Sequence, residues 1–335
     1  MQTVEMSLTV IVVLVMLALA FDFMNGFHDA ANSIATIVST RVLKPHQAVV
    51  WAAVFNVVAY FIFHLSVAST IGKGTIDAGI VDHYVVFGAL IGGIVWNIIT
   101  WYYGIPSSSS HALIGGLVGA AVAKGGMETL IWSGLGKTLV FILIAPVLGF
   151  LLGGFLMVGI SWLCNSMAPR KVDKVFRRLQ LLSAAAYSVG HGGNDAQKTI
   201  GIIWMLLLAA GVTQPNEDVP TWVIAACYTS MGLGTMFGGW RIVRTMGQRI
   251  TKLNQAKGFS ANMGGAITLF MSTLMGIPVS TTHTITGAIA GVGSTGGPKN
   301  VRWGVAGGIV WAWILTIPAS ALIAAIAWWI GRLVL

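Results

Sequence analysis

Long apolar segments recur from one end of this 335-residue chain to the other, separated by short polar stretches. A run of about 20 apolar residues is enough to cross the hydrocarbon core of a bilayer. Only 9% of the residues are Asp, Glu, Lys or Arg, whereas a soluble domain carries about 25%. The pattern predicts an all-α polytopic membrane protein. It excludes a soluble enzyme, a disordered chain and a nucleic-acid-binding protein.

Ten such segments can be counted, and several of them are irregular. The first continues through a polar patch to about residue 40, and it lacks the basic start and small-residue cleavage site of a signal peptide. Broken or re-entrant pieces would give a total of 10–12 helices. The segments run over residues 6–23, 47–68, 84–103, 107–123, 138–163, 179–209, 221–240, 259–275, 280–295 and 301–333.

The formal net charge of +9 is unevenly distributed, because 14 of the 19 Lys and Arg residues lie in alternate loops. Lys and Arg concentrate on the cytoplasmic side of a membrane protein. We therefore expect these loops inside the cell, both termini outside, and the chain in the plasma membrane. The same orientation leaves four charged residues at membrane depth: Asp22, Asp29, Asp195 and Lys198.

Two motifs occur twice in the chain. Residues 104–111, Gly-Ile-Pro-Ser-Ser-Ser-Ser-His, reappear 172 positions later as Gly-Ile-Pro-Val-Ser-Thr-Thr-His. Residues 26–34 have a counterpart 166 positions later, at 192–200. Internal repeats fix an architecture, and the similar offsets indicate a single duplication.

Five segments separate each motif from its copy, so the two halves cross the membrane in opposite directions. Such inverted-topology repeats are typical of secondary transporters, whose substrate sites lie near the midplane, although a channel can also be built on repeats. We expect a first repeat over residues 1–164, a basic cytoplasmic connector over 165–178 and a second repeat over 179–335.

Each copy of the second motif places a carboxylate and a hydroxyl on one helical face, because positions i, i+3 and i+4 are neighbours on a helix. A charge inside the bilayer is costly and marks ion or substrate paths. Glycines before the aspartates are expected to break both helices. The two faces comprise Asp29, Asn32 and Ser33 in the first half and Asp195, Lys198 and Thr199 in the second.

Two of these charged residues have a second interpretation. Asp195 and Lys198 would also fit a packed core in which they only neutralise each other, but this leaves Asp29 unexplained. Asp22 lies on the same face as Asp29. It fits either a second proton or cation group or a satisfied polar residue near a helix end.

Pro106 and Pro278 predict two helix starts within or beside the membrane, since proline favours the first helical turn and Ser and Thr are good N-caps. A helix N-terminus has free N–H groups and a partial positive charge, which suit an oxyanion. Plain N-capping is the alternative. The hydroxyls that would add donors belong to Ser108, Ser109, Ser110, Ser280, Thr281 and Thr282.

These donors suit a tetrahedral oxyanion, and the carboxylates beside it would need a proton or cation between them. His28 adjoins Asp29, and a histidine that titrates near neutral pH is a reasonable proton carrier. His111 and His283 lie one turn into the two helices, and His191 lies in the second glycine cluster. They would contact the anion, relay protons or bond a neighbouring helix.

The paired motifs resemble those of the inorganic phosphate transporter family often called PiT, whose Gly-x-Asn-Asp-x-x-Asn signature occurs once in each half. Here the signature falls on residues 26–32 and 192–198. The resemblance implies an inverted-repeat transporter, often a homodimer, that carries inorganic phosphate with a coupling cation. It implies no resident cofactor or metal. It assigns Asp29, Asn32, Asn194 and Asp195 to signature positions.

Two positions depart from the signature, since His28 and Lys198 replace asparagines. A fixed ammonium at Lys198 would occupy or repel a sodium ion. By this resemblance the chain is similar to the bacterial low-affinity, proton-coupled branch, which moves phosphate or a neutral metal–phosphate complex.

We therefore expect a proton-coupled phosphate symporter that works by alternating access, with protons carried by His28, Asp29, Asp195 or Asp22. The alternatives are a sulfate permease on the same scaffold and a sodium-coupled phosphate symporter. An enzyme is not expected, because the chain contains neither a His-Glu-x-x-His nor a Gly-x-Ser-x-Gly motif.

Overall fold

A computed structural model describes residues 6–334, and every regular element in this range is helical. The all-α polytopic prediction is confirmed, with twelve α-helices at the upper end of the expected number. The helices are α1 Leu8–Ser39, α2 Pro45–Val58, α3 Ser66–Gly74, α4 His83–Tyr103, α5 Ser109–Gly125, α6 Trp132–Leu163, α7 Pro169–Ala209, α8 Thr221–Phe237, α9 Trp240–Arg244, α10 Gln255–Leu274, α11 Thr281–Ser294 and α12 Trp303–Val334.

Four of the helices, α1, α4, α6 and α12, are long and apolar enough to cross a membrane. Helices α6 and α12 expose large apolar side chains, among them Leu143 at 71% and Leu322 at 64%, as lipid-facing helices do. The predicted segment 47–68 is broken, because the pieces that contain α2 and α3 meet at an angle of 79°.

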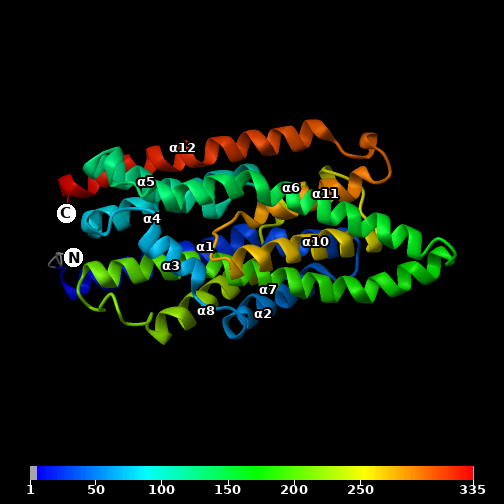
Figure 1. Cartoon of the computed structure of the whole chain (residues 1–335), viewed down its shortest axis with the longest axis horizontal. Coiled ribbons are helices and arrows are strands. Elements are labelled where there is room, and N and C mark those ends of the chain that lie inside the picture. Colours follow the sequence, from blue (N-terminus) through cyan, green and yellow to red (C-terminus); the bar gives the residue numbers. More distant parts are fainter. Residues whose placement is uncertain (1–5, 335) are drawn as a thin grey trace.

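The helices of the two halves correspond in order and in detail. Helices α6 and α12 each have 32 residues and an internal proline, Pro146 and Pro318. Gly104 and Gly276, which end or follow the preceding helices, both have a left-handed backbone, with φ of 65° and 68°. Figure 1 shows that α5 and α11 both start inside the molecule and run toward opposite ends. This is the inverted topology that the repeats predict.

The halves are interlocked rather than side by side. A Cβ on Gly119 of α5 would overlap the backbone of Ala321 in α12, and one on Gly291 of α11 would overlap Phe150 in α6. Each short helix of one half is therefore packed against the last helix of the other half. Small residues permit such close approach between membrane helices.

The basic loops gather at one end of the molecule. Arg177 donates to the Arg41 carbonyl oxygen at 3.1 Å, and Thr251 and Val301 form an isolated β-bridge. At the other end, a second bridge joins Ile76 and Leu130. The start of α1 and the end of α12 also lie at this second end (Figure 1).

The predicted connector over residues 165–178 is mostly helical. Helix α7 begins at Pro169, where proline fits the first turn, so the basic residues from Arg170 to Arg178 lie on its exposed first turns. The division at residues 164 and 179 stays a prediction.

Candidate anion and cation site

Helices α1 and α7 carry the two acidic motifs, and both run through them without interruption. The prediction that the glycine clusters break these helices is wrong. A Cβ on Gly26 would overlap the Met231 carbonyl oxygen of α8, and one on Gly192 would overlap the Asn56 carbonyl oxygen of α2. The glycines are therefore needed for close packing of neighbouring helices, and the backbone keeps its helical hydrogen bonds.

The two Pro-Ser segments start α5 and α11 as predicted. Ser108 Oγ accepts a hydrogen bond from the His111 N–H at 3.2 Å, and Ser280 Oγ accepts from the His283 N–H at the same distance. These two serines are N-caps. The hydroxyls that follow them are free to face the carboxylates of α1 and α7.

Asp29 lies among neutral or titratable partners. His28 Nδ1 is 2.7 Å from Asp29 Oδ1, and Ser109 Oγ donates to the same oxygen at 3.2 Å. His28 Nε2 is 3.0 Å from Thr100 Oγ1. The imidazole therefore bridges the carboxylate and a hydroxyl, an arrangement that can hold or move a proton.

Asp195 has a fixed positive partner. Lys198 Nζ lies 2.5 Å from Asp195 Oδ1, 2.5 Å from Ser110 Oγ and 2.7 Å from the Val279 carbonyl oxygen. Thr281 donates to Asp195 Oδ2 at 3.0 Å. His191 Nε2 lies 3.2 Å from the same oxygen. Three oxygens thus surround the ammonium, and each of its three N–H groups has an acceptor.

Contacts between the halves are matched. Asn32 Nδ2 donates to Thr281 at 3.2 Å and to Thr282 at 3.0 Å, while Lys198, at the position equivalent to Asn32, reaches Ser110 in the first half. These side chains are at most 3% exposed. Carboxylates, hydroxyls and one ammonium therefore meet in an enclosed polar centre between α1, α5, α7 and α11.

The centre also brings three metal-ligating side chains together. One ligand atom each of Asp29, His191 and Asp195 lie within 4.8 Å of one another. Two carboxylates and an imidazole are suitable ligands for a divalent cation. His191 Nδ1 is held 3.1 Å from Asn56 Oδ1, and this contact fixes the direction of the ring.

Several predicted residues lie at the edge of the centre. Thr199 donates to Asp22 Oδ1 at 2.9 Å, so these two residues are hydrogen-bonded to each other rather than to Asp29. Ser33 Oγ is buried without a partner among the described residues. Asn194 donates to Thr273 Oγ1 and the Ile277 carbonyl and accepts from the Val279 N–H, so it holds the turn before α11 in place.

The predicted histidines of α5 and α11 contact each other instead of a carboxylate. The ring centroids of His111 and His283 are 4.5 Å apart, and His283 stacks on Trp313 at 3.7 Å. Their four ring nitrogens have no hydrogen-bond partner among residues 6–334.

Sequence reasoning missed two supporting threonines and one tyrosine. Thr100 Oγ1 is 3.0 Å from His28 Nε2, and Asn194 donates to Thr273 Oγ1 at 3.0 Å. The two threonines are not repeat counterparts, because at the offset of 172 Thr100 corresponds to Ser272. The repeat comparison does not identify them, because neither threonine has a threonine at its equivalent position. Tyr187 donates to the Thr281 carbonyl at 2.8 Å, a contact that no sequence pattern indicates.

The chain is similar to known proteins over nearly its whole length. A family described as "Phosphate transporter family" matches residues 25–171 and again residues 164–324. The "Probable low-affinity inorganic phosphate transporter" of Rhizobium meliloti is 57% identical over 329 residues, which cover 98% of each chain. The protein of the same description in Bacillus subtilis is 44% identical over 332 residues, covering 98% of this chain and 99% of that one.

A solved structure is similar over nearly the whole chain. It is described as "The sodium-dependent phosphate transporter", and it superimposes with a TM-score of 0.90 at 25% sequence identity. The match covers 98% of this chain and 100% of that one.

Proposed function

The chain belongs to the phosphate transporter family, and we propose that it imports inorganic phosphate by proton symport with alternating access. It is a membrane transporter and not an enzyme. The orientation follows from the basic loops, with both termini outside the cell. A homodimer, which the resemblance implies, stays a prediction.

The position of Lys198 is the observation that favours a proton over sodium as the coupling ion. Its ammonium is held by a carboxylate, a hydroxyl and a backbone carbonyl, at 2.5 to 2.7 Å. These are oxygen ligands of the kind that hard cations prefer. A lysine in this place supplies permanently the positive charge that a bound sodium ion would otherwise bring.

Charge balance explains the need for a coupled proton. The centre contains the carboxylates of Asp29 and Asp195 and the ammonium of Lys198, all buried. An anion that approaches two carboxylates and one ammonium meets net repulsion, which is strong at low dielectric. A proton taken up at the His28–Asp29 pair, 2.7 Å apart, removes this repulsion.

Phosphate suits the centre better than sulfate, because phosphate at neutral pH can donate a hydrogen bond to a carboxylate and sulfate only accepts. Sulfate transport is therefore the less favoured substrate choice. Excess sulfate is expected to leave phosphate uptake unchanged.

The cargo can include a divalent metal ion, as a neutral metal–phosphate complex. The cluster of Asp29, His191 and Asp195 supports this, because it offers ligands to the metal while the hydroxyls face the anion. Uptake of labelled calcium that depends on added phosphate would support the complex. Phosphate uptake that is unaffected by a chelator such as EDTA would contradict it.

A sodium-coupled mechanism is the second candidate. It is favoured by the description of the similar solved structure and by Asp22 Oδ2 and Asn25 Oδ1, two buried oxygens on α1 without hydrogen-bond partners among the described residues. Two such oxygens can receive either a proton or a cation.

Replacing Lys198 by asparagine, the residue of the family signature, tests the proposal. Purified wild-type protein in proteoliposomes should take up phosphate at the same rate with and without sodium. The Lys198→Asn variant should lose most of its uptake in sodium-free buffer and recover part of it in sodium. Wild-type uptake that requires sodium would refute the proposal. If the variant stays inactive at every sodium concentration, Lys198 has a role other than replacing a cation.

A further inference from the structure

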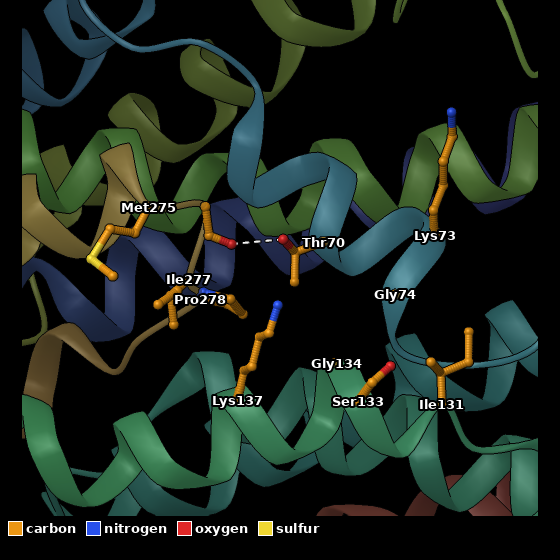
Figure 2. A pocket seen from close by; sticks show the side chains of 11 residues that line it. Thr70, Lys73, Gly74, Ile131, Ser133, Gly134, Lys137, Met275, Ile277 and Pro278 are labelled. Atoms are coloured by element: carbon orange, nitrogen blue, oxygen red, sulfur yellow. Dashed lines mark hydrogen bonds between the residues drawn. The ribbon is translucent and has the colours of Figure 1, made fainter.

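A cavity of about 300 Å³ opens at the end of the molecule opposite the basic loops. It lies between α3, α6 and the turn that leads into α11, and its lining includes Thr70, Lys137, Gly276 and Pro278. Figure 2 shows Lys137 extending from α6 into this space toward Ile277 and Pro278. The mouth of the cavity is therefore positively charged.

The charge of Lys137 is free to meet a ligand. Lys137 is exposed, and it has no hydrogen bond or ion pair with any residue of the described range 6–334. The other cation of the lining, Lys73, points away from the cavity in Figure 2. Its ammonium donates to the Pro215 carbonyl and lies 4.1 Å from the centre of the Trp204 ring. No acidic side chain belongs to the lining.

The turn that lines this cavity is continuous in sequence with a residue that contacts the enclosed centre. Gly276, Ile277 and Pro278 line the cavity, and the carbonyl of the next residue, Val279, accepts from Lys198 Nζ at 2.7 Å. Thr70 donates to the Gly276 carbonyl at 2.6 Å (Figure 2) and holds the turn on the cavity side.

The inverted repeat provides a comparison within the same molecule. A second cavity of about 430 Å³ lies against the equivalent turn, Gly104–Pro106. There Thr245 donates to the Gly104 carbonyl at 3.0 Å, as Thr70 does to Gly276. The position equivalent to Lys137 is Gly308. The second cavity has a different cation, Arg249. By the offset that relates Thr70 to Thr245, Arg249 lies at the position of Gly74.

Because the equivalent position in the other repeat is Gly308, the packing of the repeat does not require a lysine side chain at position 137. We propose that Lys137 forms an outer subsite for an oxyanion, where phosphate is held before it passes the turn 276–279 and reaches Lys198. This inference rests on the proposed import of phosphate. A lysine at the mouth of a cleft raises the local concentration of an anion and speeds its association.

Replacing the charge tests the subsite. In proteoliposomes at low ionic strength, Lys137→Gln should raise the KM for phosphate about three- to tenfold, with a maximal rate within about twofold of the wild type. Lys137→Arg should keep the wild-type KM. High salt should reduce the difference, because it screens an exposed charge. The matched control is Arg332→Gln, which removes an exposed charge at the same end outside the cavity, and it should leave the KM unchanged.

A chemical rescue gives a second measurement. The variant Lys137→Cys is made in a Cys164→Ser background and treated with membrane-impermeant thiosulfonates. A reagent that adds a quaternary ammonium should restore a low KM. One that adds a sulfonate should raise the KM further, and phosphate should slow both reactions.

Three results would overturn the subsite: an unchanged KM in Lys137→Gln, an equal rise in Arg332→Gln, or identical effects of the two reagents. A wild-type protein that takes up no phosphate would instead refute the proposed function itself.

Discussion

Asp29 and Asp195 occupy equivalent positions but have different neighbours. Asp29 meets an imidazole and a hydroxyl, whereas Asp195 is held by the ammonium of Lys198 at 2.5 Å. A buried carboxylate beside a fixed positive charge keeps its own charge. In the proposed symport we therefore place the coupled proton at Asp29 and His28, with Asp195 and Lys198 as a constant pair of charges.

Replacing Asp29 by asparagine should reduce concentrative phosphate uptake at least about tenfold, because the change removes the proton acceptor but little volume. The measurement is uptake of labelled phosphate into proteoliposomes under an inward proton gradient, with the elution profile of the purified variant as a check of folding. Glu128→Gln, an exposed acid, is the control and should match the wild type. Normal concentrative uptake by Asp29→Asn would remove Asp29 from the mechanism.

At the scale of the helices, N-cap preferences predicted where helices start, whereas glycine clusters did not predict where helices are interrupted. Ser108 and Ser280 cap α5 and α11, because the preference of serine for N-caps depends only on nearby backbone. The glycine clusters in α1 and α7 led to the wrong prediction that both helices are broken. The effect of a glycine depends on what packs against it. Gly26 and Gly192 face the backbones of α8 and α2, and that contact stabilises the continuous helix.

Gly26→Ala and Gly192→Ala should therefore destabilise the protein. The added methyl group would overlap a backbone carbonyl in each case, and backbone cannot move aside as a flexible side chain can, so a loss of about 1–3 kcal/mol is expected. The measurement is the temperature at which the detergent-solubilised protein loses its monodisperse elution peak. The control is Gly159→Ala in α6, where no heavy atom lies within 4 Å of the added carbon. Wild-type stability in both variants would show that the contacts are easily relieved.

At the scale of the whole molecule, the sequence predicted which residues form the polar centre. It did not predict which side chains of one half contact side chains of the other half. The repeats and the acidic faces indicated a shared centre. The contacts of Ser110 with Asp195 and of Asn32 with Thr282 depend on α5 packing against α12 and α11 against α6. These pairings come from shape complementarity between distant helices, which neither motifs nor apolar periodicity record.

The predicted orientation can be measured with single cysteines in a Cys164→Ser, Cys227→Ala background. Met127 is an exposed residue at the same end of the molecule as Lys137. A cysteine in its place should react with a membrane-impermeant thiol reagent added to intact cells. A cysteine in place of Asn165, between α6 and α7, should react only after the membrane is opened. The reverse pattern would mean that the basic loops lie outside and would invert the direction assigned to the Lys137 cavity.

The coupling of phosphate to protons is tested most directly by labelled phosphate uptake into proteoliposomes that hold the purified protein. One arm imposes an inward proton gradient without sodium, the other an inward sodium gradient at equal pH, and both include a set with excess sulfate. We expect accumulation in the proton arm alone, unaffected by sulfate, because Lys198 already occupies the oxygen ligands around Asp195. Accumulation in the sodium arm alone would contradict this expectation.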